Sequence, residues 1–165
     1  MEWQKFIPAF FIKWNVRNTF LKLEKELFHQ DYEQFYLPGE SKPKNIGEPF
    51  FLKRFFSRKG IILVHGYMAA PEEIRPLADY LHQNGYNVYG VRLRGHGTAP
   101  EDLAIRNWEK WYDSASRAYI IMKNSVKTFS IAGFSMGGGI ALLQAANKPG
   151  RFASVISINA PLVLS

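Results

Sequence analysis

The chain of 165 residues contains no cysteine and no apolar run long enough to cross a membrane as a helix. The lack of cysteine excludes disulfide bridges and thiolate metal sites, and it fits the reducing cytoplasm, which is the localisation that we expect. Charged residues make up 21% and hydrophobic residues 47%, which is ordinary globular usage and excludes a disordered chain.

Motifs for binding metals, cofactors and nucleic acids are also lacking. The sequence has no His-x-x-x-His pair, no Gly-x-Gly-x-x-Gly stretch and no phosphate-binding Gly-Lys-Ser/Thr loop, so we expect neither a metal nor a cofactor. The net charge is +7, but the basic residues form no long run that would act as a nucleic-acid arm. We therefore expect no nucleic-acid partner.

Residues 1–47 form an aromatic-rich, basic segment that precedes a more regular body. Of the 25 aromatic residues, 14 fall within residues 1–56. Four apolar side chains are spaced to line one side of a helix: Trp3, Ile7, Phe10 and Trp14. This helix either packs over the domain's own apolar surface, which we favour, or makes peripheral contact with a membrane through residues 1–28. Residues 37–49 are rich in Pro and Gly and indicate a linker.

The body, residues 48–165, alternates apolar runs of strand length with apolar residues at helical spacing. The expected strands are residues 50–56, 61–64, 87–92, 128–132 and 154–158. We expect one helix that begins near residue 71, a second that begins near residue 107 and a third over residues 134–147. This alternation predicts an α/β fold with a mostly parallel sheet and helices on both faces.

A Gly-x-Ser-x-Gly stretch, Gly133 to Gly137, joins an expected strand to an expected helix. A sharp turn there would hold Ser135 in a strained backbone conformation and lift its hydroxyl above the sheet. Side chains at the two glycine positions would collide in such a turn. The pattern therefore predicts that Ser135 is a nucleophile, and the alternative is a glycine-rich turn that only packs a helix on the sheet.

A second motif, His65-Gly66-Tyr67, directly follows the strand at residues 61–64. At the end of a parallel strand, the backbone N–H of Tyr67 would face Ser135. Together with the N–H of Met136 it would stabilise an oxyanion on an acyl carbonyl. We interpret His65 as a residue that fixes the loop rather than as a base.

A third motif, Gly95-His96-Gly97, follows the strand at residues 87–92. A histidine near strand ends is a candidate general base. Two flanking glycines equally indicate a tight loop in which the imidazole ties backbone groups together. We favour the loop role for His96.

The order and spacing of five groups of residues along the chain form a larger pattern. The groups are residues 65–67, 94–98 and 100–103, Trp108 with Trp111, and residues 133–138. Together they resemble the α/β-hydrolase superfamily, and within it the serine aminopeptidase-like group of carboxylesterases, monoacylglycerol lipases and lysophospholipases. The resemblance covers about residues 48–162. It implies ester hydrolysis through a Ser–acid–His triad with Ser135 as nucleophile and Tyr67 and Met136 as oxyanion hole. It also implies that His96 is not the catalytic histidine.

The triad is incomplete in this sequence, because no Asp, Glu or His follows Ser135. In the family the acid and the histidine follow later strands, and residues 154–158 correspond to about the sixth strand. We therefore expect the N-terminal portion of a hydrolase that acts on small acyl esters and that is completed by a C-terminal half in cis or in trans. The alternative is an inactive truncated domain that serves as a binding or membrane-associated module.

Overall fold

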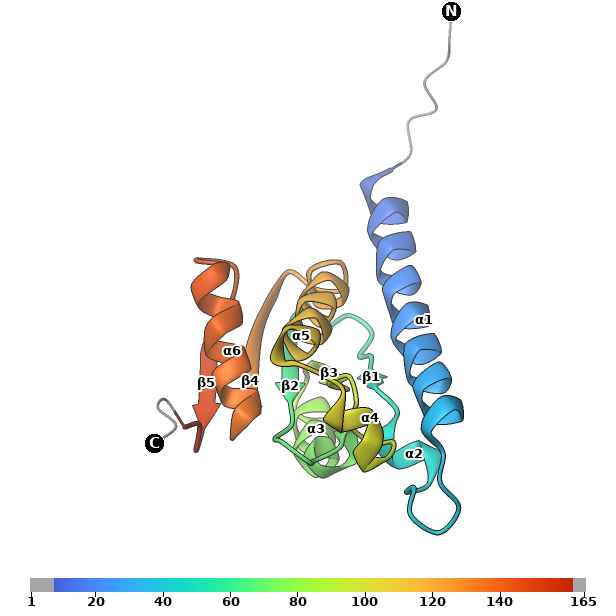
Figure 1. The fold of residues 1–165 in the computed structure, drawn as a ribbon. Coiled ribbons are helices and arrows are strands. Elements are labelled where there is room, and N and C mark those ends of the chain that lie inside the picture. The colour runs from blue at the N-terminus through green and yellow to red at the C-terminus, as the bar shows by residue number, and fades with distance from the viewer. Residues whose placement is uncertain (1–7, 162–165) are drawn as a thin grey trace, which may run out of the picture.

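The computed structural model describes residues 8–161, which form one sheet with helices packed on both of its faces (Figure 1). The five strands of the described chain lie in the order β1-β3-β2-β4-β5. Their bounds are β1 Phe50–Leu52, β2 Lys59–Val64, β3 Asn87–Val91, β4 Thr128–Phe134 and β5 Val155–Ile158. Strand β1 pairs antiparallel with β3, and the other neighbours pair in parallel. The predicted mostly parallel α/β fold is thus confirmed.

The helices cover the sheet because its two faces carry separate sets of apolar side chains. The helical segments are α1 Ala9–Phe35, α2 Lys44–Gly47, η1 Pro71–Ile74, α3 Arg75–Gln83, α4 Pro100–Ala104, α5 Trp108–Lys123 and α6 Met136–Asn147. On β2, Ile62 and Val64 face a core shared with α1, α5 and α6, whereas Ile61 and Leu63 face α3. Alternation along a strand therefore divides the core into two layers.

Several element boundaries differ from the sequence expectation. The expected strand at residues 50–56 ends at Leu52, because the chain turns through Phe56, whose φ of 66° is incompatible with a strand. The expected helix at residues 134–147 begins at Met136, because Phe134 still belongs to β4. The short helices α2 and α4 were not expected, and α2 lies within the predicted linker.

Helix α1 is divided between a projecting part and a packed part (Figure 1). Its first turns are exposed, and Phe10 is 70% exposed. Farther along, Phe20 and Leu21 pack against the core of the sheet and Phe28 is fully buried. The favoured packing on the domain's own surface is therefore wrong for Phe10 and Trp14, the described members of the predicted stripe, because both lie on the projecting turns and are 70% and 47% exposed. The part of α1 that packs on the sheet follows this stripe. Trp3 and Ile7 lie outside the described residues. Among the described helices, none has the length and apolar character that a membrane crossing requires.

Candidate active site

Ser135 lies in a sharp turn between β4 and α6, at the carboxyl end of the parallel strands. Its φ of 53° and ψ of −125° are backbone angles that residues other than glycine rarely adopt. The backbone is held there by hydrogen bonds, from Ser135 N to the Ile158 carbonyl at 2.8 Å and from Gly138 N to the Ser135 carbonyl at 2.9 Å. The Ser135 side chain makes no capping hydrogen bond to α6, so its hydroxyl is not used to begin the helix. Ser135 is half-exposed, and a turn of this kind presents the serine hydroxyl above the carboxyl ends of the strands.

The glycines around Ser135 allow backbone segments to approach closely. A Cβ at Gly133 would overlap the Gly137 carbonyl oxygen, and a Cβ at Gly137 would overlap the His65 carbonyl oxygen. Both separations are shorter than the non-bonded contacts that Cβ atoms make in proteins, so a side chain at either position would force the turn apart. The steric reason that the sequence suggested for these two glycines is therefore present in the structure.

The loop after β2 lies directly against the Ser135 turn. A Cβ built on Gly66 would lie 3.4 Å from the Ser135 Cβ. Met136 is the first residue of α6, so its N–H has no acceptor within the helix. Within residues 8–161, the N–H of Tyr67 donates to no backbone carbonyl. Two N–H groups without a backbone acceptor thus belong to residues next in sequence to Gly66 and Ser135, which lie against each other.

His65 is fully buried and joins two loops. Its Nε2 accepts a hydrogen bond from Leu93 N at 3.2 Å, and its Nδ1 lies 2.9 Å from the Gly66 carbonyl oxygen, to which it donates in the neutral form. Burial and the neighbouring His96 lower the pKa of His65 to about 3. With both ring nitrogens engaged, His65 ties the loop after β2 to the loop after β3.

His96 lies in an aromatic cluster beside His65. Its ring centroid is 5.0 Å from that of His65, 6.0 Å from that of Tyr67 and 5.6 Å from that of Trp111. The side chain is 2% exposed, and within the described chain neither ring nitrogen has a hydrogen-bond partner. Burial lowers the pKa of His96 to about 4, so the ring is neutral at physiological pH. The glycines of its loop, Gly95 and Gly97, both have positive φ, which the tight loop requires.

A buried network of charges holds this loop in place. The carboxylate of Asp31, on α1, accepts from Arg92 at 2.7 Å and from Arg94 at 2.8 Å, and it also contacts Arg106 at 3.2 Å. Asp102 accepts from Thr98 at 2.8 Å and contacts Arg92 at 3.3 Å. The loop that carries His96 is therefore fastened both to α4 and to α1.

The charges within this network depend on one another. Burial raises the pKa of Asp31, but the hydrogen bonds and positive charges of Arg94 and Arg92 outweigh burial and hold the pKa below its ordinary value. The network was not expected from the sequence. Arg92, Arg94 and Asp102 lie in the motif region, but no sequence pattern relates them to Asp31, which is far away along the chain.

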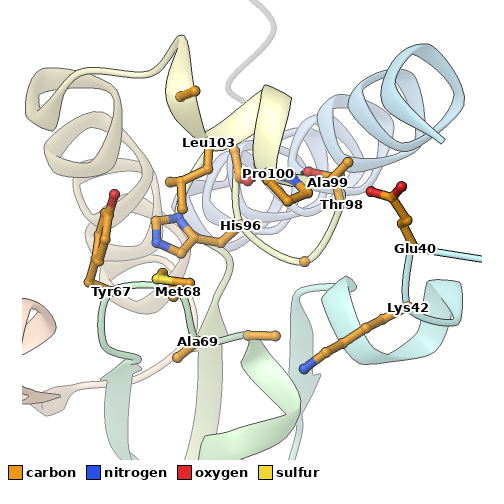
Figure 2. A pocket seen from close by; sticks show the side chains of 14 residues that line it. Glu40, Lys42, Tyr67, Met68, Ala69, His96, Thr98, Ala99, Pro100 and Leu103 are labelled. Carbon is orange, nitrogen blue, oxygen red and sulfur yellow. Dashed lines mark hydrogen bonds between the residues drawn. The ribbon is translucent and has the colours of Figure 1, made fainter. Parts of the chain in front are cut away.

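A pocket of about 350 Å³ opens between the loop after β2 and the loop that contains His96. Tyr67 and Met68 lie on one side, and Glu40 and Lys42 of the segment between α1 and α2 lie on the other (Figure 2). Most of its remaining wall consists of small or apolar side chains and loop backbone: Ala69, Ala70, Gly95, Gly97, Ala99, Pro100, Leu103 and Ala104. The pocket therefore suits an apolar group with a polar end near its rim.

Comparison with known proteins agrees with this geometry. Residues 57–164 match the serine aminopeptidase family S33. The chain is 35% identical over 113 residues to a thermostable monoacylglycerol lipase of Bacillus sp. (strain H-257), and the match covers 68% of this chain and 44% of the lipase. It is 29% identical over 85 residues to a carboxylesterase of Bacillus subtilis (strain 168), covering 51% of this chain and 35% of the esterase.

A solved structure from work on the metagenome-derived lipolytic enzymes LipS and LipT has a similar fold. It superimposes with a TM-score of 0.67 at 31% identity, and the match covers 79% of this chain and 49% of that structure. The chain thus spans less than half the length of these relatives. Because the family match covers most of the chain and contains the Ser135 turn, the chain belongs to the serine aminopeptidase S33 family of α/β-hydrolases.

Proposed function

We propose that this chain is the nucleophile-bearing part of a serine hydrolase that cleaves carboxylic acyl esters. The observation that carries the proposal is the backbone of Ser135, whose positive φ and free hydroxyl fit a nucleophile at the strand-to-helix turn. In this chemistry the Ser135 Oγ attacks the ester carbonyl carbon and its proton passes to a histidine. The alcohol then leaves with that proton, and water hydrolyses the acyl-enzyme.

The N–H groups of Tyr67 and Met136 are proposed to form the oxyanion hole. Both belong to segments that meet at Ser135, since Gly66 lies against the serine and Met136 begins α6. A donor of this kind typically contributes about 3 kcal/mol to transition-state stabilisation. His65 and the Gly95–Gly97 loop support the site by fixing these segments, and we assign no proton transfer to either histidine.

The triad acid and histidine are proposed to come from a segment that follows these residues in the relatives, supplied in cis or in trans. Strand β5 has one paired neighbour among the described strands, and its other edge is open. Ile156 and Ile158 on β5 are 43% and 39% exposed, and Leu142 and Leu143 on α6 are also exposed. Further strands on this edge would bury these side chains.

The substrate class rests on the relatives and on the pocket beside Tyr67. The relatives are described as a monoacylglycerol lipase and a carboxylesterase. The pocket has an apolar wall formed in part by Met68 and Leu103, with Glu40 and Lys42 beside it (Figure 2). We propose that it receives the apolar part of a small acyl ester.

A chimera tests this function. Residues 1–161 are joined to the part of the Bacillus sp. monoacylglycerol lipase that follows its matching region, and hydrolysis of p-nitrophenyl esters is measured. We expect ester hydrolysis that is abolished by Ser135→Ala and retained in Ser154→Ala, a matched change at an exposed serine. Hydrolysis that survives Ser135→Ala would contradict the assignment of the nucleophile.

A catalytically inactive binding module is the second candidate, and the open edge of β5 with its exposed apolar side chains favours it. This candidate predicts that the 165-residue chain folds alone and binds a partner or a membrane without hydrolysing esters. A folded chimera with bound substrate and no turnover would favour it.

A further inference from the structure

The end of the molecule opposite Ser135 carries positive charge that nearby acidic side chains do not balance. In a parallel sheet the connecting helices run against the strands, so the starts of β2, β4 and β5 lie together with the ends of α5 and α6 (Figure 1). Residues 8–17, 53–59, 123–128 and 147–154 lie at or project beyond this end, and none of them is Asp or Glu. We call these four segments the basic edge.

The cations of the basic edge are largely free for a partner. One of its ten cations, Lys148, donates to Gln144 and to the Tyr112 hydroxyl. The other nine are all exposed or half-exposed: Lys13, Arg17, Lys53, Arg54, Arg58, Lys59, Lys123, Lys127 and Arg151. Within residues 8–161, none of these nine forms a salt bridge. In contrast, the basic groups near the catalytic end, such as Arg92, Arg94 and Arg106, are bound to Asp31 or Asp102.

Large apolar side chains project from the same edge. On the first turns of α1, Phe10, Phe11 and Ile12 are 70%, 54% and 51% exposed. In the loop between β1 and β2, Phe55 is 73% exposed and Phe56 is fully exposed. Phe56 also has a φ of 66°, a conformation that favours glycine. Neither packing nor backbone geometry within the described chain accounts for a phenylalanine at this position.

We propose that the basic edge docks on a membrane surface that contains anionic lipids. Lys and Arg side chains near such a surface are attracted to its negative potential, and aromatic side chains enter the interfacial layer beside them. The loop at residues 53–59 combines both features, with Phe55 and Phe56 between two pairs of cations. Single-stranded nucleic acid, the other common polyanion, is bound in grooves with stacking platforms rather than on projecting tips. Projecting aromatic tips among free cations therefore favour a lipid surface.

This docking goes beyond ester hydrolysis and fixes the orientation of the molecule. Ser135 lies at the carboxyl ends of the strands, whereas the basic edge lies at their amino ends (Figure 1). A chain docked in this way directs Ser135 toward the aqueous phase. The membrane contact is therefore an anchor and not the route by which substrate reaches the serine.

Vesicle binding tests the proposal directly. The 165-residue chain is mixed with phosphatidylcholine vesicles that do or do not contain phosphatidylserine, and the bound fraction is measured by co-sedimentation. We expect binding to the anionic vesicles that falls steeply as salt rises. The triple variant Lys53→Gln, Arg58→Gln, Lys127→Gln should bind about 100-fold more weakly, since each cation near an anionic surface contributes about fivefold.

A second triple variant is the matched control. Lys25→Gln, Lys44→Gln and Lys110→Gln remove the same charge from exposed or half-exposed positions outside the basic edge. The control should bind within about threefold of the unchanged chain, because screening limits the reach of distant charges to about 10 Å. Equal losses in the two triple variants would contradict docking through the basic edge.

A variant at the tip of the loop at residues 53–59 tests how much the apolar side chains contribute to vesicle binding apart from the charges. The double variant Phe55→Ser, Phe56→Gly retains every cation, and glycine suits the positive φ at residue 56. It should fold at least as well as the unchanged chain and bind anionic vesicles at least tenfold more weakly, because the apolar contact is lost. Unchanged vesicle binding by this variant would overturn the proposal, as would binding to DNA but not to anionic vesicles.

Discussion

At the scale of single residues, the turn that carries Ser135 requires glycine at two positions. Gly133 and Gly137 are needed because backbone atoms lie where their Cβ atoms would be. The sequence made this requirement predictable, since the Gly-x-Ser-x-Gly pattern stands between an apolar strand and an apolar helix. The free ring nitrogens of His96 were not predictable, because they depend on how the folded loop orients its backbone around the ring.

Substitution of the turn glycines gives the first prediction. Gly133→Ala should lower the free energy of unfolding by about 3 kcal/mol, because the added methyl group overlaps the Gly137 carbonyl. Gly139 lies in the helix that follows, and a Cβ added there would meet nothing within 4 Å, so Gly139→Ala should instead raise stability by up to about 1 kcal/mol. Urea denaturation measures the free energy of unfolding of both variants. Similar free energies for the two would contradict the steric explanation.

A second prediction concerns the pH dependence of stability. Burial lowers the pKa of His96 to about 4 from an ordinary 6.5, so below pH 6.5 the unfolded chain binds a proton that the folded chain does not. Stability should therefore fall as the pH falls from 6.5 toward 4. His96→Phe should remove about 1 kcal/mol per pH unit of this slope at about pH 5, since the pKa difference then disappears.

Urea denaturation of the unchanged chain and of His96→Phe at several pH values tests this prediction. At neutral pH the variant should be about as stable as the unchanged chain, because the ring nitrogens of His96 have no hydrogen bond to lose within the described chain. Parallel pH profiles for the two proteins would show that His96 is protonated in the folded state as readily as in the unfolded state.

At the scale of elements, the strands and helices of residues 50–158 were largely predictable, whereas the role of α1 was not. Apolar periodicity indicates that a helix forms, but it does not identify the face on which the helix packs. The decisive contact of α1 is polar, since Asp31 reaches Arg92 and Arg94 beyond the end of β3. Such long-range ion pairs leave no local pattern in a sequence.

Removal of this contact gives a third prediction. Asp31→Asn should lower the free energy of unfolding by about 3 kcal/mol, because Arg92 would lose one of its two buried counter-charges and retain only Asp102. Glu33→Gln on the same helix breaks only the exposed pair with Lys44 and should cost less than about 1 kcal/mol. Thermal or urea unfolding measures the stability of the two variants. Equal stability would show that α1 does not hold the loop that contains His96.

At the scale of the whole molecule, we propose different functions for the two ends of the sheet. The carboxyl ends hold Ser135 and the pocket, and the amino ends form the basic edge. The side of the sheet at β5 is open within the described chain and carries exposed apolar side chains.

The open edge gives a fourth prediction. The 165-residue chain should self-associate in a concentration-dependent manner through β5, since an unpaired apolar strand edge is a template for pairing. The double variant Ile156→Lys, Ile158→Lys should shift the chain toward the monomer, because both side chains are exposed on that strand. Sedimentation velocity measures the association state, and association that is unchanged in the variant would place the contact elsewhere.

Ser135 is proposed as a nucleophile whose activating partners come from a following segment. Labelling with a fluorophosphonate, followed by mass spectrometry of the modified peptide, tests it most directly, because this probe reacts with a serine that a neighbouring base activates. The chimera with the Bacillus lipase segment should be labelled at Ser135, and the 165-residue chain should be labelled no faster than its Ser135→Ala variant. Labelling of the folded chimera at another residue, or rapid labelling of Ser135 in the 165-residue chain alone, would contradict the account.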